Sequence, residues 1–196
     1  MSSSRSATRL DPRAPLVLDT RELGRRPGSM RRVQRTVPAP DGWALDLVRV
    51  PAGSDVALEL RLESVVDGVL VSGTVRVSVD AECGRCLEPL RDVLEVEVQE
   101  LFAYDLSDAD EDAFALDGDF IDLEPLVRDA VVLGLPFSPV CDDACPGLCS
   151  LCGEPLAEIG PEHAHDESDP RWAALAALRP TNGSASEPLA PPEIGS

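Results

Sequence analysis

The sequence predicts an α+β protein: an antiparallel β-sheet meander, a helix that covers it, and a Cys/His-rich C-terminal segment. Apolar residues alternate with polar ones between residues 56 and 102, which is typical of strands with one buried face. Apolar residues then recur at helical spacing over 122–135. The third observation is that all six cysteines and both histidines lie in two groups, at 83–86 and 141–165.

The alternation is clearest in three segments. Residues 56–63 place Val and Leu on one face and mostly charged residues on the other, and Asp67-Gly68 then favours a hairpin turn. Valines alternate over 69–79, and the same pattern returns at 94–98. One polar face on each segment predicts an antiparallel sheet with a solvated side, which we place over residues 56–102.

Shorter elements come before this sheet. "LVLDT" at 16–20 predicts a short first strand. Residues 21–42 contain three glycines and three prolines among the arginines, so we expect a loop there, with at most a helical turn near Leu23. We find no internal repeat in the sequence.

Two helices are expected after the sheet. The one at 122–135 has Asp122 as its N-cap, Pro125 in its first turn and Pro136 at its end. A shorter helix at 170–179 is preceded by Asp169 as a cap. An acidic loop over 105–119 separates the sheet from the first helix.

These elements predict one domain over residues 16–179. Residues 1–15 and 180–196 have the composition of disordered tails. The longest apolar run, at 130–137, is far shorter than the roughly 20 residues that a membrane helix needs. The N-terminus has no apolar signal region, so we expect a cytoplasmic protein that does not contact a membrane.

The charge of −19 is unevenly distributed. Residues 1–50 carry ten arginines against five acidic residues, whereas the remainder carries seven against 31. The acidic body would repel bare nucleic acid and suits a basic partner. The basic region could attract RNA or could be a solvated linker, and its arginines are Arg25, Arg26, Arg31, Arg32 and Arg35.

The cysteines and histidines are candidate zinc ligands. A C-x2-C turn presents two thiolates to one ion, and zinc binds four nitrogen or sulfur donors in a tetrahedron. A protein without an export signal meets a reducing compartment, where clustered cysteines bind metal or act in redox chemistry more often than they form disulfides. The candidate ligands are Cys83, Cys86, Cys141, Cys145, Cys149, Cys152, His163 and His165.

Three pairings of these ligands remain open. The four cysteines at 141–152 could close one site alone. Cys149 and Cys152 could instead join His163 and His165, or join the pair at 83–86 as a split ribbon. Any closed four-ligand site would be structural, because it leaves no open position for a substrate.

No enzymatic motif is present in the sequence. There is no nucleophile elbow, phosphate-binding loop or Rossmann glycine pattern, and the acidic loop fails the EF-hand pattern because Ala113 and Asp119 replace the required Gly and Glu. We therefore expect a protein that is not an enzyme and has no small-molecule substrate. The alternative is a thiol redox or metal-handling protein that uses its C-x2-C pairs.

Four motifs together resemble the YceD family, also called DUF177. They are "CGRCLEPL", "IDLEPLVRDAVVLGLPFSPVC", "CPGLCSLCGEPL" and "DPRWAALAAL", in the family's order, over roughly residues 15–179. By this resemblance, Cys83 and Cys86 match the family's C-x-R-C pair, and the four cysteines at 141–152 match its C-terminal cluster. Many members continue with a Cys-x-Cys pair, where this chain has His163-x-His165.

The resemblance implies a function in ribosome assembly. The family is associated with accumulation of large-subunit ribosomal RNA, and its genes often lie beside one for a large-subunit ribosomal protein. We therefore expect a non-enzymatic assembly factor with a structural zinc site. Its expected partner is an assembly intermediate of the large subunit, a ribosomal protein or ribosomal RNA.

Overall fold

The computed structural model describes residues 10–105, 114–160 and 162–165. Several predicted features therefore lie wholly or partly outside the described residues. They are the helix at 170–179, the two tails at 1–15 and 180–196, and the middle of the acidic loop.

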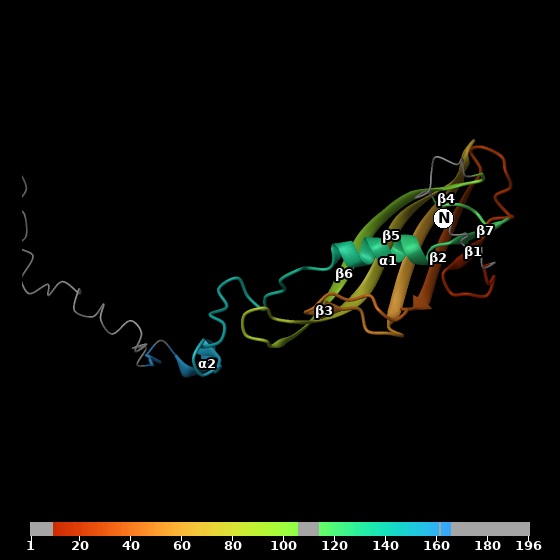
Figure 1. Ribbon diagram of the computed structural model, residues 1–196. Helices are drawn as coiled ribbons and strands as arrows, with labels where there is room; N and C mark the ends of the chain where they lie inside the picture. The colour runs from red at the N-terminus through yellow and green to blue at the C-terminus, as the bar shows by residue number, and fades with distance from the viewer. Residues whose placement is uncertain (1–9, 106–113, 161, 166–196) are drawn as a thin grey trace, which may run out of the picture.

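The main sheet is antiparallel, as predicted, and its centre is a meander of three long strands (Figure 1). These are β4 (Asp55–Ser64), β5 (Gly68–Glu82) and β6 (Pro89–Ala103). The apolar positions of neighbouring strands face each other, for example Val56 opposite Val77 and Val75 opposite Val96. This register places the alternating Val and Leu residues on one face, as the period-two pattern requires.

Two further strands complete this sheet. β2 (Met30–Pro38) pairs with β4 along its whole length, and β3 (Val48–Arg49) pairs with the end of β5. The prediction of a loop over residues 21–42 is therefore wrong where β2 lies. Most of β2 is exposed, so its two valines do not stand out among the charged residues as a strand pattern. Pro38 ends the strand at the sheet edge, where a missing N–H is tolerated.

A second layer covers the apolar face of the sheet. It consists of α1 (Glu124–Gly134) and a small sheet in which β1 (Val17–Asp19) pairs with β7 (Phe120–Asp122) (Figure 1). Two arginines of β2 fix this layer, since the guanidinium of Arg31 donates to the carbonyl of Asp19 at 3.0 Å and that of Arg35 to the carbonyl of Pro15 at 3.0 Å.

The helix α1 begins slightly later than predicted. Leu123, not Asp122, occupies the N-cap position, although the Asp122 carboxylate still accepts a hydrogen bond from the Glu124 N–H at 2.9 Å. Pro125 lies in the first turn and the helix ends before Pro136, as expected. Gly134 lets the helix approach β6, because a Cβ atom there would lie 2.7 Å from Val96 Cγ1.

The core lies between these two layers and is mostly aliphatic. Its fully buried side chains include Trp43, Phe102 and Leu62 together with many valines. Among the described residues, the core residue furthest along the chain is Leu135. Residues beyond it leave the sheet past the turn between β5 and β6 and include a short helix, α2 (Leu156–Ile159) (Figure 1).

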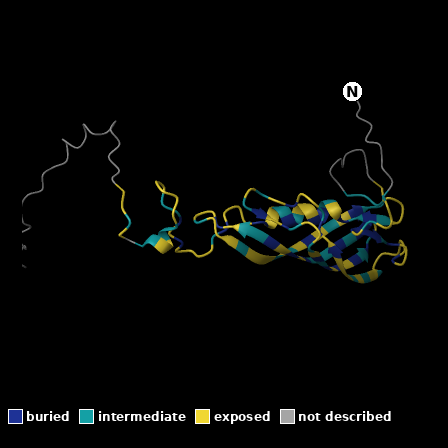
Figure 2. Cartoon of the chain, turned by 90° about the horizontal axis from the view of Figure 1, so that it is seen from below, coloured by how far each residue is buried: buried dark blue, intermediate teal, exposed yellow. Residues whose placement is uncertain are grey.

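The segment beyond the core is mostly exposed (Figure 2). We call residues 136–165 the Cys/His unit, and residues 16–135 the sheet body. Cys145 and Pro139 are among the few buried residues of the described part of the unit. In the part of the chain that the structure describes, helices are too short and too polar to cross a membrane.

Candidate metal centres

The first C-x2-C pair forms a tight knuckle in the turn between β5 and β6. The Cys83 N–H donates to the carbonyl of Glu88 at 2.8 Å, and the Leu87 N–H donates to the carbonyl of Cys83 at 2.9 Å. To close this loop, Leu87 adopts a φ of 62°, which is a costly conformation for a branched side chain. We call residues 83–88 the first knuckle.

The second C-x2-C pair forms a knuckle with the same hydrogen bonds. The Cys149 N–H donates to the carbonyl of Glu154 at 2.8 Å, and the Gly153 N–H donates to the carbonyl of Cys149 at 2.8 Å. Gly153 has a φ of 76° and occupies the position equivalent to Leu87. Residues 149–154 are the second knuckle.

The two knuckles also share their sequence. "CGRCLEPL" and "CSLCGEPL" both have the pattern Cys-x2-Cys-x-Glu-Pro-Leu, at 83–90 and 149–156. The expectation of no internal repeat is therefore wrong: a short unit occurs twice, with the same backbone hydrogen bonds. An alignment of the chain with itself over eight residues would have found it.

The first knuckle joins two cysteines of the Cys/His unit. Ligand atoms of Cys83, Cys86, Cys141 and Cys145 all lie within 4.8 Å of one another. The Sγ atoms of Cys83 and Cys145 are 3.9 Å apart, and those of Cys86 and Cys141 are 3.6 Å apart. Zinc with bonds of about 2.3 Å holds its sulfurs roughly 3.8 Å apart in a tetrahedron, so the spacing fits this ion.

The second knuckle lies beside both histidines. Ligand atoms of Cys149, Cys152, His163 and His165 also lie within 4.8 Å of one another. Cys152 Sγ is 3.3 Å from His163 Nε2, slightly less than the roughly 3.6 Å expected across a zinc tetrahedron. This group is one of the three pairings left open by the sequence.

The other two pairings do not match the geometry. The structure divides the four cysteines at 141–152 between the two groups, and it places Cys83 and Cys86 with Cys141 and Cys145. That combination was not among the three pairings. Sequence alone could not supply it, because it depends on where the end of α1 directs the following residues.

The first cysteine of each knuckle has a lowered pKa. The pKa of Cys83 falls to about 6 because its sulfur accepts hydrogen bonds from the backbone N–H groups of Cys86, Arg85 and Cys141. The pKa of Cys149 also falls to about 6, through the N–H groups of Cys152 and Leu151. These amides stabilise thiolates, which are the form that binds metal.

A second effect opposes full deprotonation of the four-cysteine group. Hydrogen bonds with the sulfurs of Cys145 and Cys86 raise the pKa of Cys141 to about 12. Adjacent thiolates repel one another, so a cation is needed to hold all of them deprotonated. Such repulsion between neighbouring thiolates is typical of a group of ligands that binds a metal ion.

Arg85 fastens the first knuckle to the Cys/His unit. Its guanidinium donates to the carbonyls of Asp143 at 2.9 Å and Cys145 at 3.1 Å. Its own carbonyl accepts a hydrogen bond from the Leu148 N–H at 3.1 Å. The Gly84 N–H adds a bond to the carbonyl of Pro139 at 2.8 Å. The contacts between unit and sheet are therefore polar and concentrated at this knuckle.

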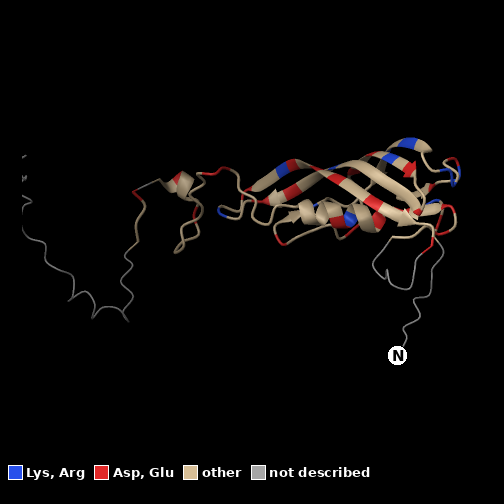
Figure 3. Cartoon of the chain, turned by 90° about the horizontal axis from the view of Figure 1, so that it is seen from above, with Lys and Arg blue, Asp and Glu red and all other residues tan. Residues whose placement is uncertain are grey.

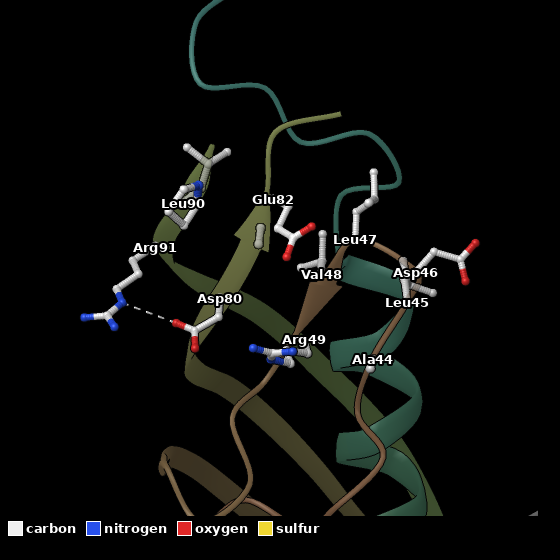
Figure 4. A pocket seen from close by; sticks show the side chains of 12 residues that line it. Ala44, Leu45, Asp46, Leu47, Val48, Arg49, Asp80, Glu82, Leu90 and Arg91 are labelled. Atoms are coloured by element: carbon white, nitrogen blue, oxygen red, sulfur yellow. Dashed lines mark ion pairs between the residues drawn. The ribbon is translucent and has the colours of Figure 1, made fainter. Parts of the chain in front are cut away.

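A hollow of about 700 Å³ lies next to the first knuckle, between residues 44–49 and the ends of β5 and β6 (Figure 4). Leu45, Leu47 and Leu90 line it alongside charged side chains. Across one side, Arg91 and Asp80 form an ion pair at 3.6 Å. The lining mixes both signs of charge and contains none of the eight candidate ligands.

Together, the fold and these groups define a class: an α+β protein whose sheet carries a paired Cys/His knuckle unit at one end. Four protein donors in each group resemble structural metal sites and not open catalytic ones. The family model described as large ribosomal RNA subunit accumulation protein YceD matches residues 71–179, and this chain belongs to that family. The match covers both knuckles, α1 and the Cys/His unit.

Curated relatives agree with this assignment. An uncharacterized protein of Mycobacterium tuberculosis (strain ATCC 25618 / H37Rv) is 47% identical over 167 residues, which are 83% of this chain and 80% of that protein. One from Mycobacterium leprae (strain TN) is 44% identical over 168 residues, covering 83% of this chain and 76% of that protein. YlbN of Bacillus subtilis (strain 168) is 29% identical over 99 residues, covering 49% and 58% respectively.

No solved structure matches this chain. The comparisons also give no support to the alternative of a thiol redox or metal-handling protein.

Proposed function

We propose that this protein supports accumulation of large-subunit ribosomal RNA as a non-enzymatic assembly factor that acts by binding in the cytoplasm. The observation that carries the proposal is the family match over residues 71–179, whose description names that process. The fold is consistent with a binding role, because the four-donor groups leave no open coordination position for a substrate.

Zinc is the structural cofactor in this proposal. The described part of the Cys/His unit buries very few side chains, and within the described residues the core extends no further along the chain than Leu135. Apolar burial therefore cannot offset the conformational entropy of ordering these residues. Metal coordination can, because binding to a site that is absent from the unfolded chain contributes directly to folding. The eight clustered Cys and His donors supply the ligands.

Charge favours a basic protein partner over bare RNA. Residues 136–165 contain carboxylates but neither Lys nor Arg, and acidic residues are also spread over the sheet body (Figure 3). A lysine- or arginine-rich ribosomal protein would complement this surface, whereas a phosphate backbone would be repelled.

The arginine-rich region is less available for RNA than the sequence indicates. Arg31 and Arg35 donate to carbonyls near β1, and the guanidinium of Arg25 lies 4.7 Å from the centre of the Tyr104 ring. These side chains stabilise the second layer. Arg25 and Arg35 are exposed despite these contacts, and Arg26 and Arg32 are exposed too, so we choose Arg26 and Arg32 to test for a phosphate contact without disturbing the contacts of the other three.

The test is complementation of a strain of the native host that lacks this protein. We expect the ratio of large- to small-subunit ribosomal RNA to fall in its absence and to recover with the wild-type chain. An unchanged ratio, with normal subunit profiles in sucrose gradients, would overturn the proposal.

A second experiment separates the two partner classes. Purified protein is titrated with ribosomal proteins and with ribosomal RNA at increasing salt. Arg26→Ala/Arg32→Ala serves as the variant, because deleting residues 1–42 would remove β1 and β2 and so unfold the sheet. Tight RNA binding that the variant loses would contradict a protein partner.

A further inference from the structure

We propose that the two knuckles are copies of one metal-binding unit and that they bind two separate ions of unequal exchange rate. This inference rests on the zinc part of the proposed function. It adds which four ligands bind each ion and which ion exchanges faster. The first metal site consists of Cys83, Cys86, Cys141 and Cys145. The second metal site consists of Cys149, Cys152, His163 and His165.

The geometry supports two complete sites. Each group supplies four donors within 4.8 Å of one another, which is the number that a tetrahedral ion needs. Each group is therefore complete without a donor from the other group. A stoichiometry of two ions per chain follows.

The repeated knuckle supports the same division. In each copy, the N–H of the first cysteine donates to the carbonyl of the Glu five residues later, and the sulfurs of both cysteines of the pair lie within 4.8 Å of the other donors of the same group. Residues 141–145, which precede the second knuckle, complete the first group of donors. Residues 163–165, which follow the second knuckle, complete the second group. The first copy takes a Cys-x3-Cys pair, and the second takes His163-x-His165.

Burial makes the two sites unequal. In the first site, Cys83 is 0% exposed and Cys145 is 9% exposed, and the backbone of Cys141 donates to Cys83 Sγ. In the second site, both Cys152 and His165 are exposed. The first site has two buried ligands, one half-buried and one exposed, Cys141, whereas the second has no buried ligand, so a chelator reaches the second ion from more sides.

The sites also hold different parts of the chain. The first connects the Cys/His unit to the turn between β5 and β6, over a separation of 62 residues between Cys83 and Cys145. The second closes a segment in which Cys152 and His163 are 11 residues apart. Loss of the second ion therefore frees residues 149–165 locally, while loss of the first releases the whole unit from the sheet.

The experiment measures metal stoichiometry and release in the full-length protein. Native mass spectrometry counts the zinc ions, and a chromogenic chelator follows their release. The variants are Cys141→Ser/Cys145→Ser for the first site and His163→Ala/His165→Ala for the second. Asp143→Asn and Glu162→Gln are matched controls, since they alter neighbouring exposed side chains that are not ligands.

We expect two ions in the wild-type chain and in both controls, and one ion in each double variant. Release from the wild type should have a fast and a slow phase, and His163→Ala/His165→Ala should lack the fast one. Cobalt substitution gives a second readout, because sulfur-to-metal charge transfer is stronger for four thiolates than for two. Far-UV circular dichroism verifies that each variant retains its sheet.

Other outcomes would overturn the inference in distinguishable ways. A single ion in the wild-type chain that is retained in His163→Ala/His165→Ala would indicate one four-cysteine site. A fast phase that persists in this variant would refute the order of release. A folded wild-type chain with no ion would remove both the division and the zinc cofactor, while the ribosomal RNA measurement would still test the assembly role independently.

Discussion

The sheet body and the Cys/His unit are stabilised by opposite means. The sheet body buries a continuous aliphatic core between two layers, so each of its long strands is held by apolar contacts as well as by backbone hydrogen bonds. The described part of the unit has almost no buried apolar surface and depends on backbone hydrogen bonds around its cysteines. The comparison shows that one short chain can combine a sheet body stabilised by apolar burial with an extension whose order depends on polar contacts around clustered Cys and His residues.

Removal of metal should produce the largest difference in stability between the sheet body and the Cys/His unit. Treating the protein with a strong chelator should unfold residues 141–165 while the sheet remains, because coordination is the main source of order in the unit. Hydrogen exchange with mass spectrometry would show loss of protection at Cys149 and Gly153 and unchanged protection in β4 and β5. Protection that persists throughout the unit would show that it does not need a metal.

Core truncation should produce the reverse pattern. Leu62 is fully buried, so Leu62→Ala should lower the free energy of unfolding of the sheet body by about 2–5 kcal/mol. Urea denaturation in excess zinc, followed by far-UV circular dichroism, measures this loss. The exposed Val93 provides the control, and Val93→Ala should change the same quantity by less than about 0.5 kcal/mol. Equal losses in the two variants would mean that burial of Leu62 contributes little to the stability of the sheet body.

Exchanging the residue with positive φ compares the two knuckles directly. Gly153→Leu should weaken metal binding at the second knuckle by about 1–2 kcal/mol, because a Leu side chain opposes its φ of 76°. Leu87→Gly should relieve the corresponding strain in the first knuckle. Zinc competition titrations measure both, and a Gly153→Leu variant with wild-type affinity would show that the knuckles do not need this conformation.

The smallest effect is expected on the solvated face of the sheet. Arg76 on β5 and Glu95 on β6 form an exposed ion pair. Since exposed ion pairs contribute little in water, Arg76→Ala should lower the free energy of unfolding by less than about 1 kcal/mol. Thermal unfolding at low and high salt would measure it, and a loss that salt does not reduce would point to packing of the arginine stem instead.

Sequence reasoning succeeded where a periodic pattern had a single physical cause. Val56, Leu58 and Val75 alternate because one face of the sheet is buried, and α1 begins and ends near the residues that its prolines indicate. β2 was missed because an edge strand held by pairing with β4 needs few apolar residues of its own.

The candidate site was only half predictable. Residue chemistry named the eight Cys and His residues that the structure gathers into two groups, and it offered the pairing of Cys149 and Cys152 with the two histidines. It did not offer the pairing of the first knuckle with Cys141 and Cys145, because this contact joins segments far apart in the chain. The repeated Cys-x2-Cys-x-Glu-Pro-Leu was readable from sequence and would have indicated two equivalent half-sites.

The spacing of the ligands has a consequence for the order of folding. Closing the 62-residue separation between Cys83 and Cys145 costs about 1.5 kcal/mol more loop entropy than closing the 11 residues between Cys152 and His163. The second site can therefore nucleate on its own, soon after synthesis of residues 149–165. The first must wait until the strands and α1 have docked, when only the short link from Leu135 to Cys141 remains to be closed. The first site can therefore form only after the sheet has folded.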